Sequence, residues 1–313
     1  MSQRPRVALV GSGAFALPSF QALQVVAEVA LVVTQPPRNS GRGLHEEPTP
    51  VGAWARGNGL PLLETADLNS AAALVQLRSA RPACLLVIAF GQKLSPEVLE
   101  GYGAFNLHGS MLPAWRGAAP IQRAIMAGET RLGVSVISLA ARMDAGEVYA
   151  RADLSVGDDE VSSEAHDRLA LLGAPLMVKT LHQWQGGTLA GDAQVESRST
   201  HAAKLRREDA WVDFNASAAL VRARINGLSP WPGVDAVVAG ESFRILRAAS
   251  GPGVAPDGTA PGTLLDEQNV ACASGVVCLR EVQPRGGRRM SLRDFIHGRR
   301  LSPGVRIESA PQR

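Results

Sequence analysis

Short apolar runs alternate with polar, glycine-containing breaks along the first 200 residues, and this pattern predicts a layered α/β fold. Runs rich in Val, Leu and Ile predict strands at residues 6–10, 29–34, 60–63, 83–89, 133–139 and 147–154. The stretches between them predict helices that end near residue 27 and cover residues 51–58, 69–79, 120–126 and 162–184. Strands that alternate with helices are typical of a doubly wound, mostly parallel sheet, so the expected fold class is Rossmann-like α/β.

The pattern changes after residue 205, where short β-like runs are separated by Gly and Pro. These runs lie at residues 234–238, 243–248, 262–265, 271–272 and 276–282, and one helix is expected at residues 215–226. Regularly spaced short strands predict a small β-barrel of the OB-like type. A polar, Gly-rich stretch precedes this region and predicts a linker. The expected organisation is therefore a domain over residues 1–188, a linker over 189–206 and a β-barrel domain over 207–313.

Two loops in the first domain are candidates for ligand contact. Residues 11–16 follow the first strand and read Gly-x-Gly-x-x-Ala, a turn whose backbone N–H groups favour anions at a helix N-terminus. The second strand ends without the acidic residue that holds a ribose hydroxyl, which argues against a nicotinamide cofactor. Residues 35–50 form a long loop rich in Pro, Gly and charge, and such loops are commonly functional. Arg38 and Arg42 could reach a phosphate backbone from this loop; a surface loop without function is the alternative.

Composition limits the cellular context and suggests a partner. Of the 313 residues 45% are hydrophobic, the apolar runs are too short for a membrane span or a signal peptide, and the three cysteines are scattered. These features predict a cytoplasmic protein without a metal site. From His201 onward there are 16 lysines and arginines against 11 acidic residues. This basic surplus favours an anionic partner such as nucleic acid, and a solvated basic face is the alternative.

Three polar residues form a candidate catalytic group. Asn106 and His108 lie two residues apart in a strand-like run, so their side chains point to the same side. Asp144 follows a second strand, at a Gly-containing turn. Because the carboxyl ends of parallel strands line the ligand crevice of an α/β sheet, Asp144 is expected to reach His108 and fix its tautomer. Taken singly, each residue suits a structural role in a strand end or a turn; the three together favour catalysis at a carbonyl.

The stretch FNLHGSMLPAWRGAAPIQRAI, residues 105–125, resembles the signature of the folate-dependent formyltransferases, in which Asn-x-His-x-Ser-x-Leu-Pro is followed by Asp-x-Gly. Further segments are similar to the branch of that family that acts on methionyl-tRNA. They are QPPRNSGRG at 35–43, THAAKLRREDAWVDF at 200–214, SPWPG at 229–233 and QPRGGRRMSLRDFIHGRRLSPG at 283–304. The resemblance covers nearly the whole chain.

The resemblance implies an activity and a set of site residues. The donor would be 10-formyltetrahydrofolate, the acceptor the methionine amino group of initiator methionyl-tRNA, and no metal would be needed. Asn106 and a protonated His108 would stabilise the oxyanion, with Asp144 holding His108 and assisting proton movement. The residues expected to bind the folate are Phe90, Gly91, Ser110, Met111, Leu112, Pro113, Arg142, Met143 and Gly146.

Basic residues are expected to hold the tRNA through its phosphates. They are Arg38, Arg42, Lys204, Arg206, Arg285, Arg288 and Arg289. Glu46 and Glu47 stand where the family usually has lysines, so the loop at 35–50 is expected to carry less positive charge than in its relatives. The enzyme is expected to be a monomer.

Three other functions remain open from the sequence. A formyltransferase acting on an amino-sugar nucleotide, or a formyl-folate hydrolase, would use the same three catalytic residues. Neither would need the arginine-rich C-terminal region, which favours tRNA. A non-catalytic nucleic-acid-binding protein on the same scaffold would not need Asn106, His108 and Asp144 together.

Overall fold

The computed structural model describes residues 4–40 and 45–310. Contacts between Cα atoms divide the chain into two compact units, and neither unit is one continuous stretch. Unit 1 comprises the residues up to Gly117, Gly133–Leu154 and His166–His201. Unit 2 comprises Ala118–Leu132, Ser155–Ala165 and the residues from Ala202. The division at residues 188 and 206 stays a prediction.

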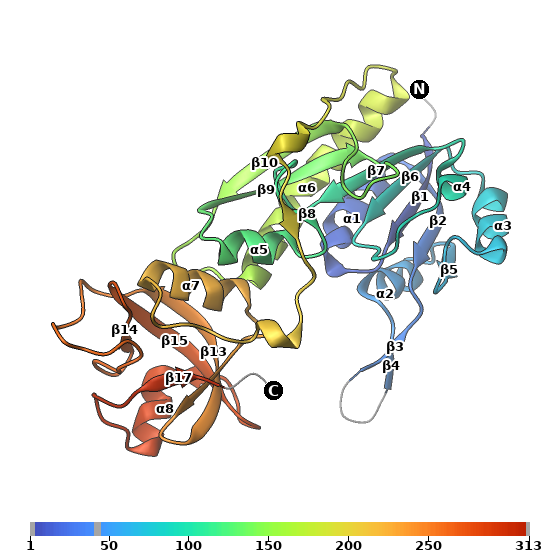
Figure 1. The fold of residues 1–313 in the computed structure, drawn as a ribbon. Coiled ribbons are helices and arrows are strands. Elements are labelled where there is room, and N and C mark those ends of the chain that lie inside the picture. Colours follow the sequence, from blue (N-terminus) through green and yellow to red (C-terminus); the bar gives the residue numbers. More distant parts are fainter. Residues whose placement is uncertain (1–3, 41–44, 311–313) are drawn as a thin grey trace. The chain divides into compact units, whose positions relative to one another are not determined.

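Unit 1 is built on a seven-stranded sheet with the order β10-β9-β7-β6-β1-β2-β5 (Figure 1). The strands are β1 (Arg6–Gly11), β2 (Glu28–Thr34), β5 (Leu62–Glu64), β6 (Cys84–Ile88), β7 (Gly103–His108), β9 (Arg131–Ser138) and β10 (Val148–Ser155). Strands β5, β2, β1, β6 and β7 are joined by parallel pairing, whereas β7 and β9 are antiparallel. The mostly parallel, Rossmann-like sheet confirms the predicted fold class of this region.

Apolar residues on both sides of the central strands explain the layers. Residues Val7 to Val10 of β1 are fully buried, as expected for a strand covered on both faces. On one face Ala8 and Val10 share a core with the helix that carries Leu74 and Leu77. The helices of unit 1 are α1 (Leu17–Val26), α2 (Pro50–Gly57), α3 (Ala71–Ala80), α4 (Pro96–Leu99) and most of α6 (Ser162–Gln185). Those of unit 2 are α5 (Pro120–Met126), α7 (Ala218–Gly227) and α8 (Leu292–Arg299).

Helix α6 packs closely on the strand that carries the candidate site. Gly173 of α6 faces the buried Leu107 side chain of β7, at a separation that leaves no room for a Cβ atom. In the last turn of the helix, the indole of Trp184 lies against Gly103 at the start of the same strand. Both ends of β7 are thus fixed by contacts in which a glycine admits a large neighbour.

The region predicted as an unstructured loop at residues 35–50 contains a hairpin, so that prediction was wrong for its two arms. Strands β3 (Arg38–Ser40) and β4 (His45–Glu47) pair antiparallel and extend away from the main sheet (Figure 1). The arms read Arg-Asn-Ser and His-Glu-Glu in the sequence, so they contain no apolar residue that would have marked them as a strand pair. Arg42 lies outside the described residues.

Unit 2 contains an antiparallel sheet with the order β14-β15-β13-β12-β17, and β16 pairs with β15. Its strands are β12 (Val234–Val238), β13 (Glu241–Ser250), β14 (Asn269–Ala271), β15 (Val276–Pro284), β16 (Met290–Ser291) and β17 (Ile307–Ser309). The ladder between β13 and β15 shifts register twice, and such irregularities increase the local twist that curls a sheet. The curled antiparallel sheet confirms the predicted β class of this region.

The core of unit 2 contains an aromatic pair, Phe243 of β13 and Phe295 of α8, whose ring centroids lie 4.8 Å apart. Helix α8 and strand β17 were not predicted. The strand expected at residues 262–265 was wrong, because Thr263 and Leu264 make only isolated bridges. The remaining elements are short: β8 (Arg116–Gly117), β11 (His201–Ala202), and the 3-10 turns η1 (Ala14–Ala16), η2 (Glu196–Arg198) and η3 (Arg207–Asp209).

Candidate active site

Asn106 and His108 occupy the last half of β7. Asn106 pairs with Val87 of β6 on one side and Ile137 of β9 on the other, so its backbone is held within the sheet. Its side chain is half-buried and makes no hydrogen bond among the described residues. The two N–H groups of its side chain are therefore available as donors to a ligand.

The His108 ring is 6% exposed and is held from two sides. Nε2 lies 2.9 Å from the carbonyl oxygen of Trp115, and Nδ1 lies 3.6 Å from Oδ2 of Asp144. Because a carbonyl oxygen only accepts, Nε2 carries the proton of that hydrogen bond. The other ring nitrogen, Nδ1, faces the Asp144 carboxylate.

Asp144 reaches His108 by a different route from the one expected. Strand β9 runs antiparallel to β7 and its last residue, Ser138, pairs with Phe105, so the two strands do not end at the same edge. The loop after β9 turns back along the sheet instead. Asp144 adopts a left-handed conformation in this loop, with φ 53°, which Asp tolerates better than most residues. Its Oδ2 accepts a hydrogen bond of 2.9 Å from the backbone N–H of Gly117.

The loop after His108, which is expected to contact the folate, is held to β9 by two hydrogen bonds. The hydroxyl of buried Ser135 donates to the Ser110 carbonyl at 2.7 Å and accepts from the Leu112 N–H at 3.1 Å. Leu112 is buried with Ile137. Of the neighbouring positions, Pro113 is half-buried and the Met111 side chain is 37% exposed.

Phe90 and Gly91 lie at the end of β6, next to the glycine-containing turn at residues 11–13. Phe90 is buried, and its carbonyl accepts a 2.8 Å hydrogen bond from the side chain of Gln35. The backbone N–H groups of Ser12 and Gly13 both donate to the Ala89 carbonyl at 3.2 Å. The turn therefore uses these two donors to join β1 to β6, and the anion-binding interpretation of this turn is not needed to account for its glycines.

Arg142, Met143 and Gly146 flank Asp144 in the loop after β9. Arg142 forms an ion pair with Glu196, and the Met143 side chain is 57% exposed. Gly146 is buried against Ser138, at a separation that a Cβ atom could not occupy. The loop thus exposes the apolar side chain of Met143, whereas Gly146 at its end is packed tightly against β9.

Several residues that position this site were missed by sequence reasoning, because they lie in the polar stretch expected to be a linker. The side-chain N–H groups of Gln194 donate to the carbonyls of Asp144 and Gly146 at 2.8 and 2.7 Å. Its oxygen accepts from Nε and Nη2 of Arg116 at 3.0 and 2.8 Å. A single glutamine in a stretch without periodicity carries no signal that would have identified it.

Glu196 adds charge to the same network. Its carboxylate lies 3.0 Å from Nη1 of Arg116, which is 7% exposed, and also pairs with Arg142. The guanidinium groups of Arg142 and Arg116 hold the pKa of Glu196 below its usual value of 4.5. The carboxylate is therefore charged at neutral pH and balances the two arginines.

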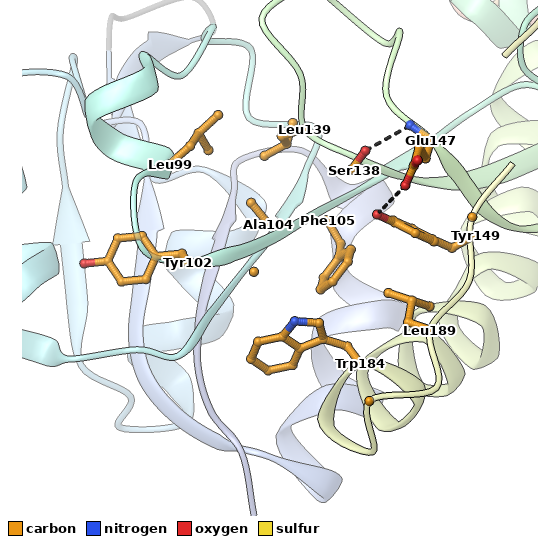
Figure 2. A pocket seen from close by; sticks show the side chains of 13 residues that line it. Leu99, Tyr102, Ala104, Phe105, Ser138, Leu139, Glu147, Tyr149, Trp184 and Leu189 are labelled. Carbon is orange, nitrogen blue, oxygen red and sulfur yellow. Dashed lines mark hydrogen bonds between the residues drawn. The ribbon is translucent and has the colours of Figure 1, made fainter. Parts of the chain in front are cut away.

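A cavity of about 480 Å³ opens at the beginning of β7, away from His108 (Figure 2). Its walls include Tyr102, Phe105, Tyr149 and Trp184, and the Phe105 ring meets the Tyr149 and Trp184 rings edge-on at 5.5 and 6.1 Å. None of the residues predicted to be catalytic or to bind folate is among the described residues that line it. We assign no role to this cavity.

Among the basic residues expected to contact tRNA, those that the structure describes are on the surface of their units. Arg38 in unit 1 is exposed, and so are the members in unit 2, namely Lys204, Arg206, Arg285, Arg288 and Arg289. Arg289 lies 3.5 Å from Glu281, and the Lys204 carbonyl accepts a hydrogen bond from Arg123. Their side chains are accessible, as phosphate contacts require.

Two kinds of feature are absent from residues 4–40 and 45–310. No group of three or more His, Cys, Asp or Glu side chains there has the arrangement of a metal site. In the same part of the chain, no helix has the length and apolar character needed to cross a membrane.

Comparisons with known proteins identify the class that this fold and site define. The model of the formyl transferase family matches residues 9–181, and that of the formyl transferase C-terminal domain matches residues 204–300. The first match includes Asn106, His108 and Asp144, and the second includes most of the antiparallel sheet. The class is that of the formyl transferases.

Full-length relatives narrow the class to one family. The chain is 39% identical to a methionyl-tRNA formyltransferase of Nitrobacter hamburgensis, over 96% of this chain and 99% of that protein. It is 38% identical to one of a Methylobacterium species, with the same two coverages. The chain belongs to the methionyl-tRNA formyltransferase family.

Among solved structures, the fold is similar to that of an N-formyltransferase from Helicobacter canadensis in complex with folinic acid and dTDP-3-aminofucose. The TM-score is 0.68 at 11% identity, over 88% of this chain and 99% of that chain. At this identity the likeness concerns the fold alone.

Proposed function

We propose that this chain transfers the formyl group of 10-formyltetrahydrofolate to the amino group of methionine on initiator tRNA, for use in translation initiation. The observation that carries the proposal is the convergence of His108 and Asp144, 3.6 Å apart, beside the free amide of Asn106. Relatives named methionyl-tRNA formyltransferase over 96% of the chain support the choice of acceptor.

The three side chains have separate roles in this reaction. The formyl oxygen gains negative charge as the methionine amine attacks, and the side-chain N–H groups of Asn106 stabilise that charge, since no hydrogen bond among the described residues occupies them. The Trp115 carbonyl occupies Nε2 of His108, so a proton is held or moved at Nδ1. Asp144 orients this nitrogen and stabilises the ring when both nitrogens carry protons.

The surroundings of Asn106 suit a folate. Bound 10-formyltetrahydrofolate supplies a formyl group already activated by its nitrogen leaving group. Phe90 and Leu112 are buried in two separate apolar clusters of the residues around the site. Met111 and Met143 offer exposed, adaptable thioethers that suit contact with a flat ring. We assign the folate to these residues together with Gly91, Ser110, Pro113, Arg142 and Gly146.

The tRNA is proposed to bind through exposed basic residues. Arg38 and Arg42 would contact it from the residues 35–50, and Lys204, Arg206, Arg285, Arg288 and Arg289 from the second half of the chain. Such contacts act on phosphates and set the register of the tRNA, so binding should weaken steeply with salt. We propose that residues 1–188 carry the chemistry and residues 207–313 the larger part of the tRNA contact, in a monomer that works in the cytoplasm.

The test is formyl transfer from 10-formyltetrahydrofolate by the purified chain, with four parallel reactions. The acceptors are methionine-charged initiator tRNA, free methionine, an amino-sugar nucleotide and no acceptor. The proposal expects product with the charged tRNA alone. Transfer to the sugar nucleotide, or hydrolysis of the donor at the same rate without acceptor, would contradict the proposed acceptor. No turnover of the donor in any reaction would contradict the proposed formyl-transfer activity.

A further inference from the structure

The conformation of the loop that carries Asp144 needs support from outside the loop. Asp144 has φ 53°, a left-handed conformation that costs free energy in an L-amino acid. Met143 and Arg142 beside it have exposed side chains, so packing of the loop itself gives little support. The carbonyls of Asp144 and Gly146 both point to one side chain, the amide of Gln194.

The orientation of the Gln194 amide is fixed by its partners. A guanidinium only donates, so the oxygen faces Nε and Nη2 of Arg116 at 3.0 and 2.8 Å. The two carbonyls only accept, so the nitrogen faces Asp144 and Gly146. Gln194 is half-buried, whereas Ala193 and Val195 on either side of it are exposed. It is thus the side chain that this stretch turns inward.

Arg116, the partner of Gln194, lies between the two residues that hold the candidate catalytic pair. The preceding residue, Trp115, accepts from His108 Nε2 through its carbonyl. The following residue, Gly117, donates its N–H to Asp144 Oδ2. Arg116 is itself buried, with its backbone N–H bonded to the Thr200 carbonyl at 2.9 Å.

We propose that Gln194 is a positioning residue for the formyl transfer, because its one amide joins the Asp144 loop to the Trp115–Gly117 segment and so fixes Asp144 relative to His108. The proposal rests on the proposed function of this site. Gln194 touches neither His108 nor the Asp144 carboxylate, and acts through backbone atoms. A misplacement of about 1 Å at a catalytic group can reduce a rate about 100-fold, so loss of this link should be visible in kcat.

Two substitutions separate the halves of the amide. Gln194→Glu keeps oxygens for Arg116 but replaces the donors to Asp144 and Gly146 by an acceptor. Gln194→Leu removes both halves at similar size. The control is Val195→Ala, which lies next to Gln194 on the same stretch and has a side chain that is 51% exposed. We expect kcat to fall about 10- to 100-fold in both Gln194 variants and less than about threefold in the control.

Two readouts distinguish positioning from general stability. The pH profile of kcat in Gln194→Leu should move in the same direction as in Asp144→Asn, because both changes remove the carboxylate from its place beside His108. Hydrogen–deuterium exchange should rise in the peptide covering residues 140–147 of both Gln194 variants and stay as in the parent in Val195→Ala. The exchange measurement needs no acceptor, so it remains informative if the parent fails to formylate tRNA.

The proposal is overturned if exchange of residues 140–147 is unchanged in both Gln194 variants. It is equally overturned if kcat falls only in proportion to a lower folded fraction, measured by circular dichroism, with the parent pH profile retained. A parent that turns over no donor would instead contradict the proposed function, and the positioning role would then fail with it even where exchange rises.

Discussion

Two segments of unit 1 meet at the candidate site, and they differ in what their residues contribute. Residues 103–117 supply Asn106 and His108 together with the backbone groups of Trp115 and Gly117. Residues 192–200 supply no group that faces the candidate catalytic pair, yet Gln194 and Glu196 hold the loops around it. The first segment supplies the candidate catalytic groups, and the second supplies hydrogen bonds and ion pairs that position the loops around them.

The difference explains why one segment has a recognisable pattern and the other has none. Catalysis requires particular functional groups at particular spacings, so Asn106 and His108 stand two residues apart on a strand. Positioning requires only that a donor and an acceptor end in the right place, and the chain can reach that place from any stretch that passes nearby. Predictions about the two segments should therefore differ in kind: loss of rate for the first, loss of order or stability for the second.

Replacing the imidazole should have the largest effect. His108→Ala should lower kcat by about 10²- to 10⁴-fold, the usual range for a general acid or base, with little change in the KM for the folate. Steady-state formylation of charged tRNA measures both constants. His182→Ala, at an exposed position of α6, is the matched control. An unchanged kcat in His108→Ala would remove the first segment from the chemistry.

Removing the charge of Asp144 should have a smaller effect. Asn tolerates the left-handed conformation and can still accept from the Gly117 N–H, so Asp144→Asn changes charge and little else. We expect kcat to fall about 100-fold because the ring is no longer oriented by a carboxylate. If kcat stays within twofold of the parent, the 3.6 Å pair has no part in catalysis.

Arg116→Lys tests the contacts that join the two segments, namely those of Arg116 with Gln194 and Glu196. Lysine cannot donate two hydrogen bonds to Gln194 while a third reaches Glu196, so the half-buried oxygen of Gln194 would lose one of its two donors. We expect a loss of about 1–3 kcal/mol in the free energy of unfolding and a fall of about tenfold in kcat. Chemical denaturation and kinetics on one preparation give both numbers. A loss of stability with an unchanged kcat would show that the contacts of Arg116 with residues 192–200 do not affect catalysis.

Ser135→Ala examines support from the sheet. The variant leaves the Ser110 carbonyl and the Leu112 N–H without their buried partner, at a cost of about 1–3 kcal/mol in the free energy of unfolding. Ser302→Ala, at an exposed site, is the control and should leave stability unchanged. Thermal and urea denaturation measure the difference. Equal stability of the two variants would mean that the loop after His108 does not depend on β9.

The smallest effect is expected at Glu196. Its pKa is lowered in the folded protein, so its contribution to stability is present above the usual value of 4.5 and is lost as the pH falls below it. Glu196→Gln should therefore be slightly less stable than the parent at pH 7, and this difference should shrink as the pH falls toward 3. Urea denaturation at the two pH values checks this. A difference that grows toward pH 3 would have the wrong sign.

Much of this molecule was predictable, and the reasons for the exceptions are specific. Buried strands such as β1 and β6 have continuous apolar runs, and Asn106 and His108 share a face by the period of a strand. The closeness of Asp144 to His108 was expected for an incorrect reason, because β9 is antiparallel and its loop turns back. Strand direction depends on crossover connections that no local pattern encodes.

The β3–β4 hairpin and the Gln194 bonds were not predictable for a common reason. The arms of the hairpin, Arg38–Ser40 and His45–Glu47, contain no apolar residue, so they show no alternation of apolar and polar side chains. Gln194 makes its contacts to residues about 50 positions earlier in the chain, at Asp144 and Gly146. Polar contacts over such distances leave no periodic trace in the sequence.

The most direct test of the division between the two segments is a double-mutant cycle on kcat with Gln194→Leu and Asp144→Asn. If Gln194 acts by placing the Asp144 carboxylate, its loss should matter much less once that carboxylate is gone, and the two effects should be strongly non-additive. The account predicts that Gln194→Leu lowers kcat about 10- to 100-fold in the parent and less than about threefold in the Asp144→Asn background. Equal effects in both backgrounds would show that Gln194 serves the enzyme independently of Asp144, and would contradict it.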